Sequence, residues 1–261
     1  MPNVYVACWA MSDAALGGNA AARADTLKNI ALAADTQLKI SGRAAGGAFT
    51  RMLIVPEYFF NAGGGGGLVS RDDKHAIYRR LEQVSAAVPE LVLIAGSIAY
   101  GKGFFSTDTY NVCPVLLNGQ IIAKLYKSND DGVYQINGTF RTKTDAGKAT
   151  PIVQLPNGIR LGLDICMDFN NHRLRNYIQH NPPRPDMHVQ ISGTNMTGPS
   201  SAEAKVNGVY IHCDLGGKGV NGASAWRVTA HNAGMAATTR IQPNQTLQPG
   251  IGRLMFFTTP V

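Results

Sequence analysis

Three segments of the chain end in side chains that could act together on a carbonyl carbon. Leu53-Ile-Val-Pro-Glu57 brings a carboxylate to the end of a short apolar run, and Leu161-Gly-Leu-Asp-Ile-Cys166 does the same for a thiol. Between them, residues 110–127 form an apolar hairpin pattern whose second half carries Lys124 and Lys127. A thiolate is a nucleophile, a carboxylate can carry its proton and an ammonium can stabilise an oxyanion. These residue types therefore suit chemistry that passes through an acyl-enzyme.

Each of these residues alone also has an ordinary structural explanation. A free cysteine such as Cys166 is usually a small buried hydrophobe. Glu57 could be a solvated residue at the rim of a sheet, although a carboxylate that ends a buried strand is costly to desolvate without a partner. Lysine is almost never fully buried unpaired, so a surface position is the default for either lysine. Because strand residues three positions apart point to opposite faces, Lys124 and Lys127 cannot both serve one site.

The elements that must position these side chains are mostly strands. Asn118-Gly119 between two apolar runs is a strong hairpin signal, and Asp72 is a candidate N-cap for the second helix. Strands outnumber helices and several neighbours look like hairpins, which favours a mixed sheet covered by helices. The pattern predicts strands over residues 4–9, 52–55, 91–95, 110–117, 120–126, 159–166, 187–192, 206–213, 223–229 and 254–258, and helices over 21–38, 72–88 and 172–180.

The composition fits one globular domain over residues 1–261. Hydrophobic residues make up 44% of the 261, enough for one large core. The net charge of +7 favours nucleic-acid or membrane-surface binding, but the basic residues are scattered without a run of five or six like charges, so neither partner is expected. No apolar run approaches the ~18 residues of a membrane span, and no secretory signal is visible. The four cysteines are widely spaced without a Cys-x-x-Cys pair, which predicts reduced thiols in a cytoplasmic protein.

In their order and context, the three segments resemble the nitrilase superfamily of carbon–nitrogen hydrolases, whose members use a Glu-Lys-Cys triad. The resemblance extends from the first strand to about Gly234 and includes the Gly-x-Ser of residues 222–224. The family's lysine closes the strand after the hairpin, which selects Lys127 over Lys124. The resemblance implies a four-layer αββα sandwich in a single domain. It also implies a homodimer or higher homo-oligomer and no cofactor.

The implied mechanism gives each residue a role. Glu57 takes the Cys166 proton, delivers it to the leaving amine or ammonia, and later activates the water that hydrolyses the thioester. Lys127 supplies a fixed positive charge for the oxyanion, and the backbone N–H of Met167 adds a second donor; one such donor is typically worth ~3–4 kcal/mol. The expected substrate is a small amide or N-carbamoyl compound. Nitrile hydrolysis and acyl transfer are variants of the same chemistry.

Two features depart from the family's pattern. Family members often carry a second glutamate near the lysine and the substrate, but no Glu lies between Lys127 and Cys166, and the corresponding position falls on the shorter Asp131. Residues 169–173, Phe-Asn-Asn-His-Arg, replace the usual Arg and Pro-Glu, whereas Asp168 matches and is expected to hold the nucleophile turn by hydrogen bonds. Because of these departures, the alternative remains that the protein is a catalytically impaired relative that binds an amide or acidic ligand.

The glycine run and the histidines have less specific interpretations. Residues 63–67 are all glycine, which predicts a flexible surface loop, or a mobile lid because the run follows Glu57 closely. The run lacks the Gly-Lys-Ser/Thr ending of a phosphate loop. The histidines show no His-x-His or His-x-x-x-His spacing, so no metal site is expected. His172 is expected to start a surface helix, with substrate orientation as the alternative.

Overall fold

Two β-sheets stack face to face at the centre of the molecule. The computed structural model describes residues 3–10, 19–46, 48–61, 67–103, 106–129, 139–140, 150–193, 198–215, 222–248 and 252–261. In this part of the chain the first sheet has the strand order β14-β15-β1-β2-β3-β5-β4, with β6 and β7 also paired to β5, and the second has the order β13-β12-β11-β10-β9-β8. Parallel pairs (β1–β2–β3 and β9–β10–β11) are combined with antiparallel ones, so the predicted mixed sheet is confirmed.

The strands of the first sheet are β1 (Asn3–Ala10), β2 (Phe49–Ile54), β3 (Leu91–Ile94), β4 (Ile98–Gly103), β5 (Ser106–Leu117), β6 (Gln120–Tyr126), β7 (Thr139–Phe140), β14 (Gln245–Leu247) and β15 (Arg253–Pro260). Those of the second sheet are β8 (Ile152–Gln154), β9 (Arg160–Ile165), β10 (Met187–Ser192), β11 (Val209–Asp214), β12 (Ala223–Asn232) and β13 (Met235–Ile241). The helices are α1 (Ala20–Ala45), α2 (Arg71–Ala87), α3 (Met167–Asn170) and α4 (Arg173–His180), with a 3₁₀ turn at Pro199–Ser201.

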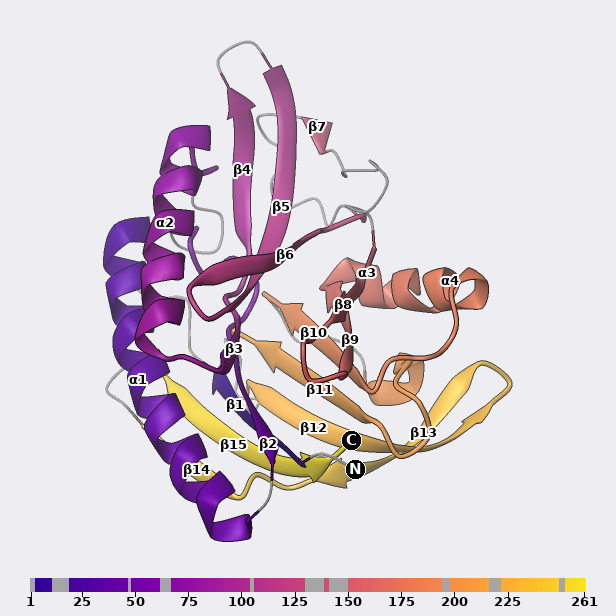
Figure 1. Cartoon of the computed structure of the whole chain (residues 1–261). Helices are drawn as coiled ribbons and strands as arrows, with labels where there is room; N and C mark the ends of the chain where they lie inside the picture. The colour runs from indigo at the N-terminus through magenta and orange to yellow at the C-terminus, as the bar shows by residue number, and fades with distance from the viewer. Residues whose placement is uncertain are drawn as a thin grey trace.

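Alternation along the strands produces the layers. On β1, Tyr5 and Trp9 pack in the cluster that includes α1 and α2, whereas Val4 and Val6 pack in the cluster between the sheets, because successive strand side chains point to opposite faces. Figure 1 shows α1 and α2 side by side over the first sheet, and α3 and α4 beside the second. The layer order is therefore helix, sheet, sheet, helix.

The two long helices begin at side-chain caps. Asn19 accepts a hydrogen bond from the backbone N–H of Ala22 at 3.0 Å and opens α1, which continues to Ala45, well beyond the predicted end at Leu38. The prediction that Asp72 caps the second helix is wrong. Ser70, in extended conformation, accepts from the Asp73 N–H at 3.0 Å, so Asp72 already lies within the first turn.

The predicted hairpin at Asn118-Gly119 is confirmed. The two residues have φ of 52° and 77°, the pair of positive values that a two-residue type I′ turn requires. A Cβ on Gly119 would also lie 3.1 Å from the Ala86 Cβ of α2, so glycine is needed here for space as well as for conformation. This turn sets where β6 begins and how it pairs with β5, and hence where Lys127 lies.

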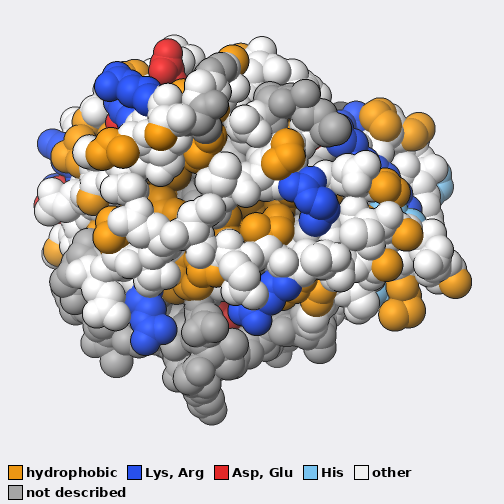
Figure 2. All heavy atoms as spheres, turned by 90° about the horizontal axis from the view of Figure 1, so that it is seen from below, with side chains coloured by type: hydrophobic (Ala, Val, Ile, Leu, Met, Phe, Trp, Pro, Cys, Tyr) orange, Lys and Arg blue, Asp and Glu red, His pale blue; other side chains and the backbone are white. Residues whose placement is uncertain are grey.

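Several elements were not predicted, namely β4, β7, β8, β13, β14 and α3. β13 is built mainly of alanine, threonine and arginine and has little apolar signal, while β7, β8, β14 and α3 are only two to four residues long. Within the described residues, no helix is both long and apolar enough to span a membrane. On the face in Figure 2, lysine and arginine side chains stand apart from one another among apolar and uncharged surface.

Candidate active site

A buried ion pair lies where strands of both sheets end. Lys127 Nζ donates to Glu57 Oε1 at 2.8 Å, and the two side chains are only 1% and 0% exposed. Asn111 Nδ2 donates to the same oxygen at 2.8 Å, and the backbone N–H of Gly193 donates to Oε2 at 3.1 Å. Three donors on one desolvated carboxylate favour its ionised form. Since Glu57 follows β2 and Gly193 follows β10, this carboxylate joins the ends of the two sheets.

The strand register decides which lysine reaches the interior. The Lys127 N–H donates to the Asn111 carbonyl at 2.8 Å, which continues the β5–β6 pairing one residue beyond Tyr126. Three residues earlier, Lys124 is exposed, and its Nζ lies 4.6 Å from the ring centroid of Tyr78 on α2. The structure thus places Lys127 beside Glu57 and Lys124 at the surface.

Tyr58 supports the lysine in a way that the sequence reasoning missed. Lys127 Nζ lies 3.3 Å from Tyr58 Oη and 5.4 Å from the centre of its ring. Tyr58 has φ of 58°, and its backbone N–H donates to Ser97 Oγ at 3.0 Å, which holds this turn directly after Glu57. The Tyr58 hydroxyl and ring therefore replace part of the water lost by the buried ammonium. The one feature of the sequence that could have indicated this role of Tyr58 is its position directly after Glu57.

Cys166 occupies a sharp turn between β9 and α3. Its φ of 51° and ψ of −108° fall outside the conformations that non-glycine residues usually adopt, which costs of order 1–3 kcal/mol. Its N–H donates to the Ile191 carbonyl at 2.8 Å, and its own carbonyl accepts from the Phe169 N–H at 3.0 Å. The side chain carries a reduced thiol, and the residue is 5% exposed. These hydrogen bonds hold the strained turn at the end of β9, directly before the backbone N–H of Met167.

Two bridges hold the Cys166 turn near the ion pair. The first is β10, because Ile191 accepts from the Cys166 N–H and Gly193, two residues later, donates to Glu57. The second is Asp168, whose carboxylate accepts from the backbone N–H groups of Ser128 and Asn129 at 2.8–3.1 Å. Since Ser128 directly follows Lys127, the helix that begins after the thiol is tied to the segment that carries the ammonium.

The Asp168 carboxylate is fully buried and also pairs with Arg173 Nη1 at 3.0 Å. Burial raises the pKa of Asp168, while Arg173 and the hydrogen bonds from Asn129 and Ser128 act in the opposite direction. Arg173 lies in the segment that departs from the family's pattern, and its partnership with Asp168 was not foreseen. The contacts of Asp168 tie the turn after Cys166 to Ser128 and Asn129 and to α4, and its expected role beside a nucleophile stays a prediction.

Other residues singled out in the sequence lie elsewhere or outside the described part. Asp131 lies outside the described residues, as does most of the glycine run at 63–67. His172 precedes α4 and is half-buried, with φ of 56°. Among the described residues, no cluster of three or more histidine, cysteine, aspartate or glutamate side chains is arranged to hold a metal ion.

A second polar cluster at the end of β10 was also missed. Ser192 Oγ lies 2.7 Å from His212 Nε2, and the same nitrogen lies 3.9 Å from Asp214 Oδ2. Burial lowers the pKa of His212, and the Asp214 carboxylate opposes that shift. Ser192 immediately precedes Gly193, so this cluster adjoins the carboxylate of Glu57.

Solved structures with this arrangement of layers include amidases. An amidase from Nesterenkonia sp. matches 99% of this chain with 90% of its own, at 15% identity and a TM-score of 0.62. A cysteine-to-alanine variant of the Nesterenkonia AN1 amidase, from the nitrilase superfamily, gives the same coverage at 12% identity and a TM-score of 0.59. The chain has the nitrilase-superfamily fold. The αββα sandwich predicted from the sequence is thereby confirmed.

The nitrilase-superfamily fold is matched here without close similarity of sequence. The glutamine-dependent NAD+ synthetase from Acinetobacter baumannii matches 92% of this chain with 41% of its own length, at 14% identity and a TM-score of 0.55. No protein-family model matches the sequence, and no curated protein does either. The fold is therefore established by three-dimensional similarity alone.

Proposed function

We propose that this protein is a carbon–nitrogen hydrolase of the nitrilase superfamily that cleaves a small amide or N-carbamoyl compound. The observation that carries the proposal is the buried Lys127–Glu57 pair, tied through β10 and Asp168 to the strained turn of Cys166. A buried ion pair costs desolvation free energy and is weak support for stability. A buried pair that is tied to a turn carrying a thiol suits an acyl-transfer site.

The first half of the proposed reaction forms a thioester. Glu57 accepts the Cys166 proton, and the sulfur attacks the carbonyl carbon of the substrate. The oxygen gains negative charge, which the Lys127 ammonium and the backbone N–H of Met167 stabilise. The C–N bond then breaks as Glu57 returns its proton to the nitrogen, and the amine or ammonia leaves.

The second half hydrolyses the thioester. Glu57 takes a proton from water, the resulting hydroxide attacks the thioester carbon, and the same two donors stabilise the second oxyanion. The C–S bond breaks, a carboxylic acid is released, and the thiol recovers its proton. The Gly193 and Asn111 donors keep the carboxylate of Glu57 oriented through both halves. Asp131 is proposed to accompany Lys127 in place of the family's second glutamate.

The similar structures support this chemistry in general terms. One structure of the Nesterenkonia sp. AN1 amidase, a glutamate-to-glutamine variant, contains the product of Michael addition of acrylamide at its active-site cysteine. The same amidase therefore pairs a reactive thiol with amide substrates on this fold. At 10–15% identity, the substrate of the present protein has to come from experiment.

Intact-mass spectrometry tests the proposal directly. Acid-quenched reactions with a panel of amides, N-carbamoyl compounds and nitriles should reveal an acyl adduct that maps to Cys166. The adduct and turnover should vanish in Cys166→Ala. Cys113→Ala is the matched control, since Cys113 is also buried and free, and burial raises the pKa of its thiol well above the ordinary value. Full turnover in Cys166→Ala would end this mechanism.

Two other outcomes would redirect the assignment. An adduct that is released by amines but not by water would make the protein an acyltransferase. Ligand binding without any adduct would identify the catalytically impaired relative.

The proposal extends to the form of the protein. Residues 1–261 are proposed to act as one domain in a cytoplasmic homodimer or higher homo-oligomer, with neither nucleic acid nor membrane as a partner. The cytoplasmic location is supported by four buried cysteines in the reduced form. Light scattering coupled to size-exclusion chromatography would give the oligomeric state.

A further inference from the structure

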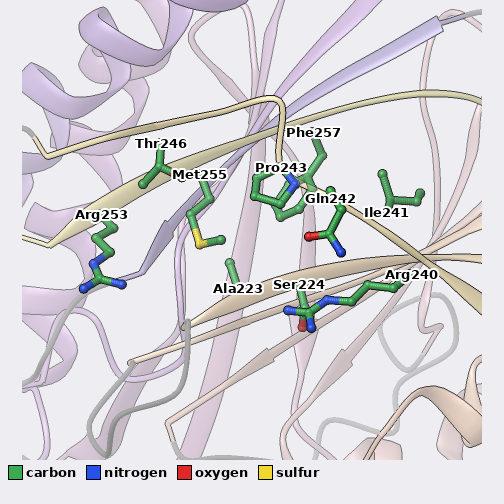
Figure 3. Close-up of a pocket in the computed structure, with 10 residues that line it drawn as sticks. All are labelled: Ala223, Ser224, Arg240, Ile241, Gln242, Pro243, Thr246, Arg253, Met255 and Phe257. Carbon is green, nitrogen blue, oxygen red and sulfur yellow. The ribbon is translucent and has the colours of Figure 1, made fainter.

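A cleft of about 180 Å³ opens at the edge of the sandwich where the chain crosses from one sheet to the other. The crossing segment leaves β13 after Ile241 and enters β14 at Gln245, and its Gln242 and Pro243 line the cleft. The rest of the lining comes from the end of β13, the start of β12, and from β14 and β15. Figure 3 shows Arg240 and Arg253 on opposite sides of this view, with Ser224 between them.

The polar lining of the cleft is made of hydrogen-bond donors without an acid. Arg240 and Arg253 carry two positive charges, and Ser224, Gln242 and Thr246 add two hydroxyls and an amide. No carboxylate is among the described residues that line the cleft. Both arginines are exposed at the rim of the cleft, so each presents its positive charge to a ligand that enters. Arginine also presents a planar fork of donors that matches a carboxylate.

The deeper lining of the cleft is apolar. Met255 and Phe257 are 6% and 1% exposed and belong to the core between the sheets, and Ile241 and Pro243 add apolar walls. A strongly hydrated ion such as phosphate gains nothing from such a surface. An organic anion with a small hydrocarbon body could place that body against Met255 and Phe257 and its charge near the arginines.

The cleft lies at the same end of the sandwich as the Glu57–Lys127 pair. Arg253 pairs with Ala10 at the end of β1, and Ala223 pairs with Cys213 near the end of β11. In strand order, β15 lies two strands from β2, and β12 lies two strands from β10. At ~4.8 Å per strand this is a lateral separation of roughly 10 Å from the strands that carry the pair. The cleft is thus a neighbour of the candidate active site and not a part of it.

We propose that this cleft is a second binding site, specific for a small organic carboxylate whose charge is held by Arg240 and Arg253. The inference needs no hydrolase activity, so it can fail or succeed independently of the proposed function. The carboxylate group would contact the guanidinium forks and the Ser224 and Thr246 hydroxyls. Its apolar body would cover Met255 and Phe257.

Methyl NMR of ¹³C-methionine-labelled protein separates this cleft from the candidate active site. Met255 lines the cleft, whereas Met167 directly follows Cys166, and Met255→Leu and Met167→Leu assign the two resonances. Benzoate is the probe, because its ring will shift the methyl group that it covers. We expect saturable movement of the Met255 resonance with a Kd of ~1 mM or below.

The arginine variants test the source of affinity. Arg240→Gln and Arg253→Gln should each weaken benzoate binding about tenfold, the loss expected for one hydrogen-bonded charge contact. Arg79→Gln is the matched control, because it removes one exposed charge from α2 and should leave the affinity unchanged. Benzamide, which has the same shape without the charge, should bind at least about tenfold more weakly.

Several results would overturn the proposal. A shift of the Met167 resonance alone would place benzoate at the candidate active site. The charge argument would be removed if both arginine variants bound benzoate as tightly as the unaltered protein, if benzamide bound as tightly as benzoate, or if binding did not saturate by ~10 mM benzoate. Tighter binding of inorganic phosphate than of benzoate, followed by the same Met255 resonance, would show that the site takes inorganic anions and that the apolar lining has no part in recognition.

Discussion

Replacing Lys127 by methionine should destabilise the protein much more than an ordinary surface substitution. Methionine is close to lysine in length, so the packing changes little, but the ammonium that contacts Glu57 is lost. The Glu57 carboxylate would remain fully buried, still accepting from Asn111 and Gly193 but no longer paired with the ammonium. Lys127→Met therefore isolates the effect of leaving a buried charge without its counter-charge.

The burial of the pair sets the size of the effect. At 1% and 0% exposure, solvent screens neither side chain, and the Nζ–Oε1 distance of 2.8 Å is that of a direct hydrogen bond. Breaking such a pair by removing one partner typically costs about 3–5 kcal/mol. For a chain of this size, 1 kcal/mol corresponds to a change in Tm of roughly 2–4 °C. Lys127→Met should therefore lower Tm by roughly 6–20 °C.

Urea denaturation and calorimetry would measure the loss. The matched control is Arg80→Met, which breaks the Arg80–Asp25 ion pair, whose side chains are 43% and 72% exposed. A surface pair of this kind contributes at most about 1 kcal/mol. The double variant Glu57→Gln/Lys127→Met removes both buried charges, and it should be more stable than Lys127→Met alone.

Two results would refute this reasoning. Equal destabilisation in Lys127→Met and Arg80→Met would mean that water reaches the Glu57 carboxylate. A double variant whose loss equals the sum of the two single losses would mean that the two side chains act independently, despite their contact.

Three further predictions concern the surroundings of the pair. Asp168→Asn should leave the Arg173 guanidinium without its carboxylate and destabilise the fold by about 1–3 kcal/mol in urea denaturation, whereas a loss below ~0.5 kcal/mol would contradict its anchoring role. His212 has a lowered pKa when folded, so the unfolded chain binds its proton first and stability falls as pH drops below ~6.5. His212→Gln should remove up to about 1.4 kcal/mol per pH unit from that slope, and an unchanged slope in denaturation curves from pH 6.5 downwards would argue against it. Asp131→Asn should lower kcat strongly at little cost in stability, and Asp130→Asn should lower it far less; the reverse ranking in a turnover assay would exclude Asp131 from the site.

The parts of the fold that could be predicted are those with a strong local pattern. Asn118-Gly119 predicted a hairpin because few residues other than glycine and asparagine adopt positive φ readily. The buried strands β1 and β10 showed as segments of alternating side chains, and α1 as a helical spacing of apolar residues. Where that pattern is weak, prediction failed. β13 consists largely of small and polar residues, and it pairs with β12 because the backbone hydrogen bonds favour it.

The residues of the candidate site also divide into those with a local sequence pattern and those without one. Glu57, Lys127 and Cys166 could be nominated because each ends an apolar segment and because their order resembles a known family; their catalytic roles stay predictions. The supporting groups, such as Tyr58 and Gly193, carry no such signal, because a backbone N–H or a tyrosine hydroxyl looks the same in any sequence.

The amino-acid sequence by itself determined the local conformations, the alternation that builds each sheet, and the short set of residues able to do chemistry. Only the tertiary structure decided which of them meet. Glu57 is 70 residues from Lys127 and 136 from Gly193, and local backbone preferences cannot specify contacts over such separations. They arise when the apolar faces of the two sheets stack and bring the ends of β2, β6 and β10 together. Burial between those sheets then makes the ion pair of Glu57 and Lys127 necessary, since neither charge could remain there alone.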